Sequence, residues 1–281
     1  MEITALEHIA HQVRRDIVRM VHQVQSGHPG GSLGCVEFFT ALYFHLLEHT
    51  PASFDPNAEN QDVFVLSNGH ISPVYYSILA RSGYFPTTEL ASFRRINSRL
   101  QGHPTTHENL PGVFVASGSL GQGMSVAIGA AQAKKLNQKP HLVYTLHGDG
   151  ELQEGQIWEA IMYAGARGID NLVSTVDANG QQIDGSTNTV LPMGNLAEKF
   201  RAFGWDVLEI EQGNHMPSVL NGLVNAKSRS HKGKPVAVIM HTQMGAGVDF
   251  MQGTHEWHGI APNNDQLALA LAQIPETLGD Y

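Results

Sequence analysis

The chain has 281 residues, a single cysteine and a formal net charge of −9 at pH 7, from 26 acidic and 17 basic residues. A chain of this length can bury a large apolar core without disulfides, and its interspersed, mainly acidic charges argue against a nucleic-acid-binding surface. No stretch resembles a signal peptide or reaches the length of a membrane span. We expect a cytoplasmic protein whose partner is a small molecule or another protein.

The first predicted element is an amphipathic helix over residues 6–24, where apolar residues recur every three or four positions. A loop with four glycines follows, Ser26–Gly34 (SGHPGGSLG), and then a helix over about 36–47. Cys35 lies in this apolar run and is expected to be a core residue. The local sequence explains His28 equally well as a helix cap or as a functional group.

Two further histidines follow the same pattern. A strand is predicted over residues 62–67; it ends in Asn68-Gly69-His70 and precedes a helix over about 73–81. His103 stands in a second Gly-His-Pro segment. Because all three histidines lie in glycine-bearing loops between regular elements, we expect them to converge on one cleft.

The next segment predicts a strand over residues 113–116, the loop SGSLGQG and a helix over about 124–136. Glycines expose backbone amides, and the positive end of a helix favours an anion, so the loop is compatible with a phosphate. It has neither the lysine of a P-loop nor the spacing of a Rossmann fingerprint, and is weak evidence alone.

Residues 141–185 predict a β-α-β crossover with strands over 142–146 and 172–176. Polar loops follow both strands, at the edge where open α/β sheets bind ligands. Asp149 and Asn179 offer a carboxylate and an amide oxygen, which suit a Mg²⁺ ion that carries a diphosphate. Gly-Asp-Gly by itself is more often only a turn.

Strands over residues 204–210 and 235–242 bring the predicted total to six, with a surface helix over about 216–230 and a last helix over 267–274. Six strands that alternate with helices predict one α/β domain over 1–281, a three-layer sandwich with a mostly parallel central sheet. The loop over 244–259 contains His255 and His258, which are three residues apart. Its glycines argue against a helix that would present them as a metal-binding pair.

Five motifs, in this order, resemble the amino-terminal half of transketolase over nearly the whole chain: SGHPGGSLG, LSNGH, GHP, GSLGQG and GDGELQEG. The last of them, with Asn179 at the end of the next strand, also resembles the thiamine diphosphate signature. The resemblance implies a thiamine diphosphate-binding fold with bound Mg²⁺, in whose place Ca²⁺ or Mn²⁺ can stand. It implies that Asp149, Asn179 and the backbone carbonyl of Gln181 bind the metal.

The resemblance also implies roles for other residues. Cofactor-binding residues are expected at His70, Gly118, Ser119, Leu120, Asp149, Gly150 and Asn179. Catalytic residues are expected at His28, His103, His255, His258 and Glu154. The family pattern places Glu154 between paired cofactors at a subunit interface, and it fits either His255 or His258 as the histidine that faces the cofactor. Some members carry basic residues where this chain has Met244 and Ala246.

In this family a glutamate on a separate pyrimidine-binding domain activates the cofactor, and no such domain is expected within these 281 residues. The resemblance therefore implies the amino-terminal subunit of a split transketolase of pentose phosphate or related carbohydrate metabolism. It would transfer a two-carbon ketol unit from a ketose or ketose phosphate to an aldose. Its expected partners are a carboxy-terminal subunit on a separate chain and a second copy of itself, together a heterotetramer, with Trp158, Ile161 and Met162 packed against that copy.

Other functions remain open at this point. A decarboxylating subunit of a 2-oxo-acid dehydrogenase, or an enzyme that resembles deoxyxylulose phosphate synthase, would keep the same cofactor half. The three histidine loops favour ketol transfer, because function is read from the site and not from the fold. A silent regulatory subunit is the non-enzyme alternative, and the presence of Asp149 and Asn179 argues against it.

Overall fold

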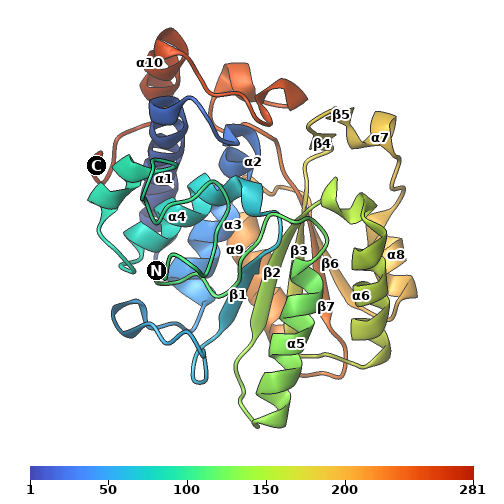
Figure 1. Cartoon of the computed structure of the whole chain (residues 1–281). Helices are drawn as coiled ribbons and strands as arrows, with labels where there is room; N and C mark the ends of the chain where they lie inside the picture. Colours follow the sequence, from blue (N-terminus) through green and yellow to red (C-terminus); the bar gives the residue numbers. More distant parts are fainter.

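The computed structural model describes all 281 residues, and its centre is a five-stranded parallel sheet with the order β1-β2-β3-β7-β6 (Figure 1). The strands are β1 (Val63–Leu66), β2 (Val143–Gly148), β3 (Leu172–Ala178), β6 (Asp206–Ile210) and β7 (Val236–His241). All four pairings are parallel. The predicted α/β class with a mostly parallel central sheet is confirmed.

Helices cover both faces of the sheet. The larger layer comprises α1 (Ile3–Val24), α2 (Pro29–Gly34), α3 (Val36–Ala41), α4 (Ser72–Arg81), α9 (Met216–Arg229) and α10 (Asn264–Gln273). The other layer comprises α5 (Gly123–Leu136), α6 (Gly155–Ala166) and α8 (Leu196–Ala202). A small hairpin, β4 (Gln181–Gln182) and β5 (Gly185–Ser186), and the short α7 (Thr187–Val190) follow β3.

The two layers enclose two hydrophobic clusters, of 51 and 21 buried residues. Strand β1 shows how the chain supplies both. Phe64 and Leu66 belong to the larger cluster, and Val63 and Val65 to the smaller one, because successive side chains of a strand point to opposite faces. A strand that is buried on both faces reads as a continuous apolar run, which is the pattern of this sequence.

The predicted strand over residues 113–116 is wrong, so the sheet has five strands and not six. This segment follows a turn in which the Val113 amide donates to the Leu110 carbonyl, and it joins no sheet. Its apolar character serves packing instead. Val113 belongs to the larger cluster, and Phe114 and Val115 pack against the smaller one.

One predicted helix differs in character from the prediction. The helix expected over residues 36–47 is α-helical only to Ala41 and continues as a π-helix over Leu42–Leu46. The expected surface helix is present as α9, with Val219 and Leu223 packed in the larger cluster and Asn221 and Asn225 exposed. No helix in the structure has both the length and the apolar character needed to cross a membrane.

The predicted β-α-β crossover is present as β2, α6 and β3, and its register places the two polar loops together. Gly148 at the end of β2 lies beside Asp177 of β3, and the Asp149 amide donates to the Asp177 carbonyl at 3.1 Å. The Gly-Asp-Gly loop and the Asn179 loop therefore lie at one edge of the sheet.

Candidate functional site

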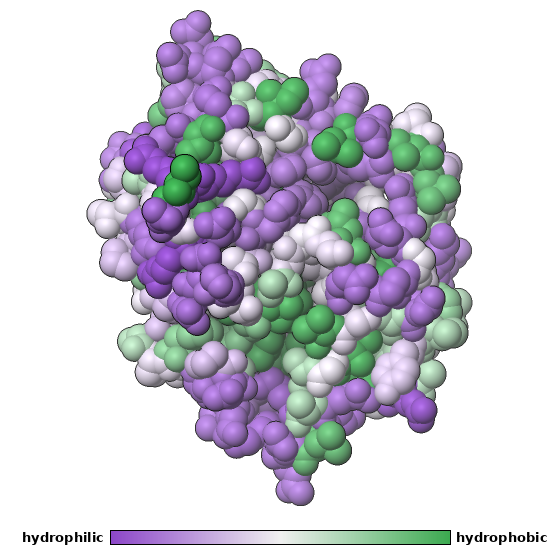
Figure 2. Space-filling view, in the orientation of Figure 1, coloured by the Kyte–Doolittle hydropathy of each residue, from purple (hydrophilic) through white to green (hydrophobic).

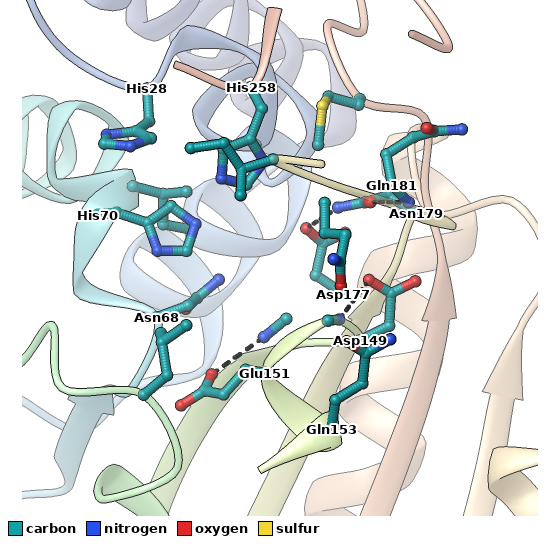
Figure 3. Close-up of a pocket in the computed structure, with 18 of the residues that line it drawn as sticks. His28, Asn68, His70, Asp149, Glu151, Gln153, Asp177, Asn179, Gln181 and His258 are labelled. Carbon is teal, nitrogen blue, oxygen red and sulfur yellow. Dashed lines mark hydrogen bonds between the residues drawn. The ribbon is translucent and has the colours of Figure 1, made fainter. Parts of the chain in front are cut away.

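A cavity of about 400 Å³ opens at the carboxyl ends of β1, β2 and β3. Most of the predicted site residues line it: His28, His70, His103, Gly118, Leu120, Asp149, Gly150, Glu154, Asn179, Gln181 and His258. In Figure 3 the labelled histidines lie on one side of the cavity, and Asp149, Asp177 and Asn179 lie on the other. The site therefore has an imidazole side and an oxygen-rich side.

Backbone amides and one buried carboxylate fix the oxygen-rich side. The Asp149 carboxylate accepts from the amides of Gly150 at 2.8 Å and Gly180 at 2.7 Å. Asn179 donates through Nδ2 to Asp177 at 2.8 Å, and its Oδ1 accepts from the Gln181 amide at 2.8 Å. Asp177 thus orients the side-chain amide of Asn179: the amide nitrogen points toward Asp177, and the amide oxygen points away from it.

The carboxylates of Asp149 and Asp177 have no cationic side chain beside them in the cavity lining. Burial, together with the charge of Asp177, raises the pKa of Asp149 to about 7. Burial also raises the pKa of Asp177, against hydrogen bonds from Thr242 and Asn179. No lysine or arginine lines the cavity. A hard divalent cation would relieve this deficit, and the oxygen donors fit Mg²⁺.

On the imidazole side, three rings meet in mutual contact. The ring centroids of His28 and His70 are 5.0 Å apart, those of His28 and His258 5.5 Å, and those of His70 and His258 5.1 Å. Burial first, and the neighbouring rings second, lower the pKa of His28 to about 4 and that of His70 well below its ordinary value. These imidazoles are therefore neutral near pH 7.

Several polar atoms of this wall have no partner within the protein. The Nδ1 atoms of His28 and His258 and the Oδ1 atom of Asn68 are buried without a hydrogen bond. All three residues line the cavity. Since a buried polar atom without a partner is costly, these atoms fit a polar ligand that would complete their hydrogen bonds.

The choice between His255 and His258 depends on the loop that carries them. His255 begins a short 3₁₀ helix, His255–Trp257, and is exposed outside the cavity. Trp257 is buried against Phe250, with ring centroids 5.4 Å apart, and anchors the loop. His258 then turns into the cavity (Figure 3). Of the two histidines, only His258 lines the cavity.

The glycine loop before α5 contributes two residues to the cavity and turns a third away. Gly118 and Leu120 line the cavity, whereas Ser119 is exposed and does not. Gly118 adopts a φ of +120°, and a Cβ atom there would lie 2.6 Å from the His103 ring. Only glycine lets the backbone pass so close to this histidine.

Two amides at the end of this loop, those of Gly121 and Gly123, are occupied by side chains of the protein. Glu151 accepts from the Gly121 amide at 2.8 Å and from the Ser67 hydroxyl, which itself accepts from the Gly123 amide at 3.2 Å. Burial opposes its ionisation, but His147, Ser67 and Gly121 together hold the pKa of Glu151 below its usual value. An anion is favourable at a helix amino terminus.

Sequence reasoning missed several residues of the cavity. Glu151 stands within the motif GDGELQEG, two residues after Asp149, and Asp177 stands two residues before Asn179; their proximity to these residues was the available signal. Gln182 and Ile183 come from the unpredicted β4–β5 hairpin. No local pattern marked them.

Comparison with known proteins gives consistent results. The family description "Transketolase, thiamine diphosphate binding domain" matches residues 6–275. The chain is 37% identical over 269 residues to the 6-deoxy-6-sulfo-D-fructose transketolase subunit SqwG of Clostridium sp. (strain MSTE9), covering 96% of each protein. It is 39% identical over 272 residues to an apulose-4-phosphate transketolase subunit of Actinobacillus succinogenes, again covering 96% of each.

Solved structures agree with this relationship. The chain superimposes on transketolase from Campylobacter jejuni with a TM-score of 0.89 at 33% identity, and on transketolase from Leishmania mexicana with 0.88 at 31%. The two superpositions include 98% and 96% of this chain, but only 43% and 41% of the solved transketolase chains. The chain thus spans about two-fifths of these solved proteins.

The buried imidazoles predict a pH-dependent stability. Because the folded-state pKa of His70 lies below the ordinary 6.5, the unfolded chain binds the proton first as the pH falls, and stability is lost downward from about pH 6.5. The contribution of one histidine is at most about 1.4 kcal/mol per pH unit. His70→Asn should therefore lose less unfolding free energy than the wild type between pH 7 and pH 5, measured by urea unfolding. His107→Asn, at an exposed site, should follow the wild type; an unaltered pH slope in His70→Asn would contradict this account.

Proposed function

Because this chain belongs to the transketolase family, as an amino-terminal subunit of the split form, we propose that its cavity binds the diphosphate half of thiamine diphosphate together with Mg²⁺. The observation that carries the proposal is the cluster of oxygen donors around Asp149 and Asn179, in a cavity without a lysine or arginine. A diphosphate needs positive charge nearby, and here a cation is its main source. The backbone carbonyl of Gln181 is the proposed third protein ligand, and Ca²⁺ or Mn²⁺ can replace Mg²⁺.

Residues 1–281 act in this proposal as one thiamine diphosphate-binding domain that transfers a two-carbon ketol unit from a ketose to an aldose. When bound, thiamine diphosphate supplies an electron sink for breaking the carbon–carbon bond. The protein itself must move protons to and from the oxygen atoms of the sugar. Imidazoles can both take up and release a proton, and a lowered pKa keeps them unprotonated at pH 7 and makes their protonated form a stronger acid; we assign this role to His28, His103 and His258, with His70 nearer the cofactor.

Substrate charge supports a site shared with a second chain. The names of the two relatives specify sugars with a sulfo or a phosphate group. The cavity of this chain offers no lysine or arginine to such a group. We propose that an anionic substrate is recognised by the separate carboxy-terminal subunit, which also supplies the pyrimidine side of the site, and that the assembly works in the cytoplasm.

The proposed contact with a second copy involves α5 and α6, but not all the residues expected from the sequence. Ile161 is fully buried, and Trp158 packs on Phe200 and Phe203 with centroids 5.9 and 6.1 Å apart. Met162 is 52% exposed. It shares the outer face of these helices with Val126 and Tyr163, and Figure 2 shows apolar residues gathered over this region. Glu154 lies exposed at the cavity edge and the start of α6, where a second copy could reach it.

Cofactor binding should depend on the partner chain. Calorimetry should find weak or no binding of thiamine diphosphate with Mg²⁺ to the isolated chain and tight binding to the two-subunit complex. Asp149→Ala should abolish the metal-dependent part, whereas Asp265→Ala, at an exposed position of α10, should leave it intact. Unchanged affinity in Asp149→Ala would remove the metal assignment.

The reconstituted complex should shorten a ketose and lengthen an aldose, as a coupled assay with a panel of sugars and sugar phosphates would show. His103→Ala should lower kcat about a hundredfold to ten-thousandfold, the typical contribution of a general acid or base, with cofactor affinity nearly unchanged. His107→Ala, four residues further on and exposed, is the matched control. Release of carbon dioxide from 2-oxo acids without any shortening of a ketose would assign the complex to another thiamine enzyme class.

Assembly should depend on the exposed apolar face. Light scattering of the mixed subunits should give the mass of a heterotetramer, and Met162→Glu should reduce it to a one-to-one heterodimer, because a charge would be buried in the contact. Leu136→Glu changes an equally apolar exposed residue at the far end of α5 and should not alter the mass. A wild-type complex that is already a heterodimer would argue against this contact.

A further inference from the structure

Arg94 lies outside the cavity lining but joins two of the loops that carry its histidines. Its Nη1 atom donates to the Ser26 hydroxyl at 2.8 Å, and its Nη2 atom to the Gly102 carbonyl at 3.4 Å. Ser26 stands two residues before His28, and Gly102 directly precedes His103. One guanidinium group therefore ties together two loops that are far apart in the sequence.

The local structure is built closely around this side chain. The Arg94 backbone has a φ of +55°, in the left-handed region that residues other than glycine seldom occupy. A Cβ atom at Gly102 would lie 2.9 Å from the Arg94 Cζ atom, so a side chain there would displace the guanidinium from its present position. Strain of this kind persists where the surrounding structure requires it, which often indicates a functional constraint.

We propose that Arg94 is a positioning residue that aligns His28 and His103 across the cavity and holds a positive charge behind both imidazoles. The inference rests on the proposed function only in giving these two histidines proton-transfer roles; the tie between the loops does not depend on it. A planar guanidinium suits this task because its several N–H groups point in fixed directions, toward two acceptors at once.

The charge of Arg94 acts on the same two histidines. Burial is the largest cause that lowers the pKa of His103, and Arg94 is the next. For His28, burial and His258 come first, then Arg94 and His103, with His70 in ring contact. Arg94 thus adds to the forces that keep both imidazoles neutral.

The histidines of the isolated chain provide a test that needs no cofactor or substrate. In Arg94→Met, NMR titration should show raised pKa values for His28 and His103, with that of His258, which Arg94 does not influence, unchanged. Arg94→Lys, which keeps the charge, should restore both values toward the wild type. Arg99→Met is the matched control, because Arg99 binds Glu89 at 2.8 and 2.9 Å on the same segment. Unmoved pKa values in Arg94→Met, or equal shifts in Arg99→Met, would overturn the proposal.

Ser26→Ala tests the tie without changing any charge and without relying on the Arg94 variants to fold. It should speed amide hydrogen exchange over residues 26–31, and unchanged exchange there would refute the tie. In the reconstituted complex, Arg94→Met should lower kcat by up to about a hundredfold, the scale of a misplaced group, at unchanged thiamine diphosphate affinity. A wild-type complex without ketol transfer would count against the proposed function alone, since titration and exchange are measured on this chain by itself.

Discussion

The pairing of β2 with β3 brings two buried carboxylates to one edge of the sheet, and the rest of the site depends on this concentration of negative charge. Gly148 pairs with Asp177 in the register of β2 and β3, so the next residue, Asp149, lies close to Asp177. Amides of the glycine-rich loops can orient these carboxylates, but they carry no net charge to neutralise them. The cation proposed above would neutralise these carboxylates and could hold an anionic ligand beside them.

The opposite wall of the cavity is under a different constraint. It holds three imidazoles in contact, and these rings must stay uncharged to lie so close together. Three rings in contact cannot all be protonated at modest cost, and burial weakens protonation further. The Nδ1 atoms of His28 and His258 are buried without a hydrogen-bond partner. The same physical effect, burial, thus raises the pKa values of Asp149 and Asp177 and lowers those of His28 and His70, so the two sides of the cavity differ in charge.

Sequence reasoning recovered the elements whose signal is local and periodic. The β2-α6-β3 crossover, the histidine loops and the likeness to transketolase followed from apolar runs and spaced motifs, and the structure and relatives confirm the fold and the family. The reasoning failed where tertiary contacts decide. Residues 113–116 are apolar because they pack against two clusters and not because they pair in a sheet. Similarly, no local signal reveals that Glu151 occupies the amino terminus of α5.

Glu151 also shows that the protein itself can fill part of a predicted anion site. The loop SGSLGQG has the glycines and the helix start of an anion site, and an anion does lie there, but it belongs to the protein. Its bonds to Ser67, Gly121 and Gly148 join the ends of β1 and β2 to this loop. Glu151 therefore fixes this loop through the Gly121 amide and the Ser67 hydroxyl, and Gly118 and Leu120 of the same loop line the cavity.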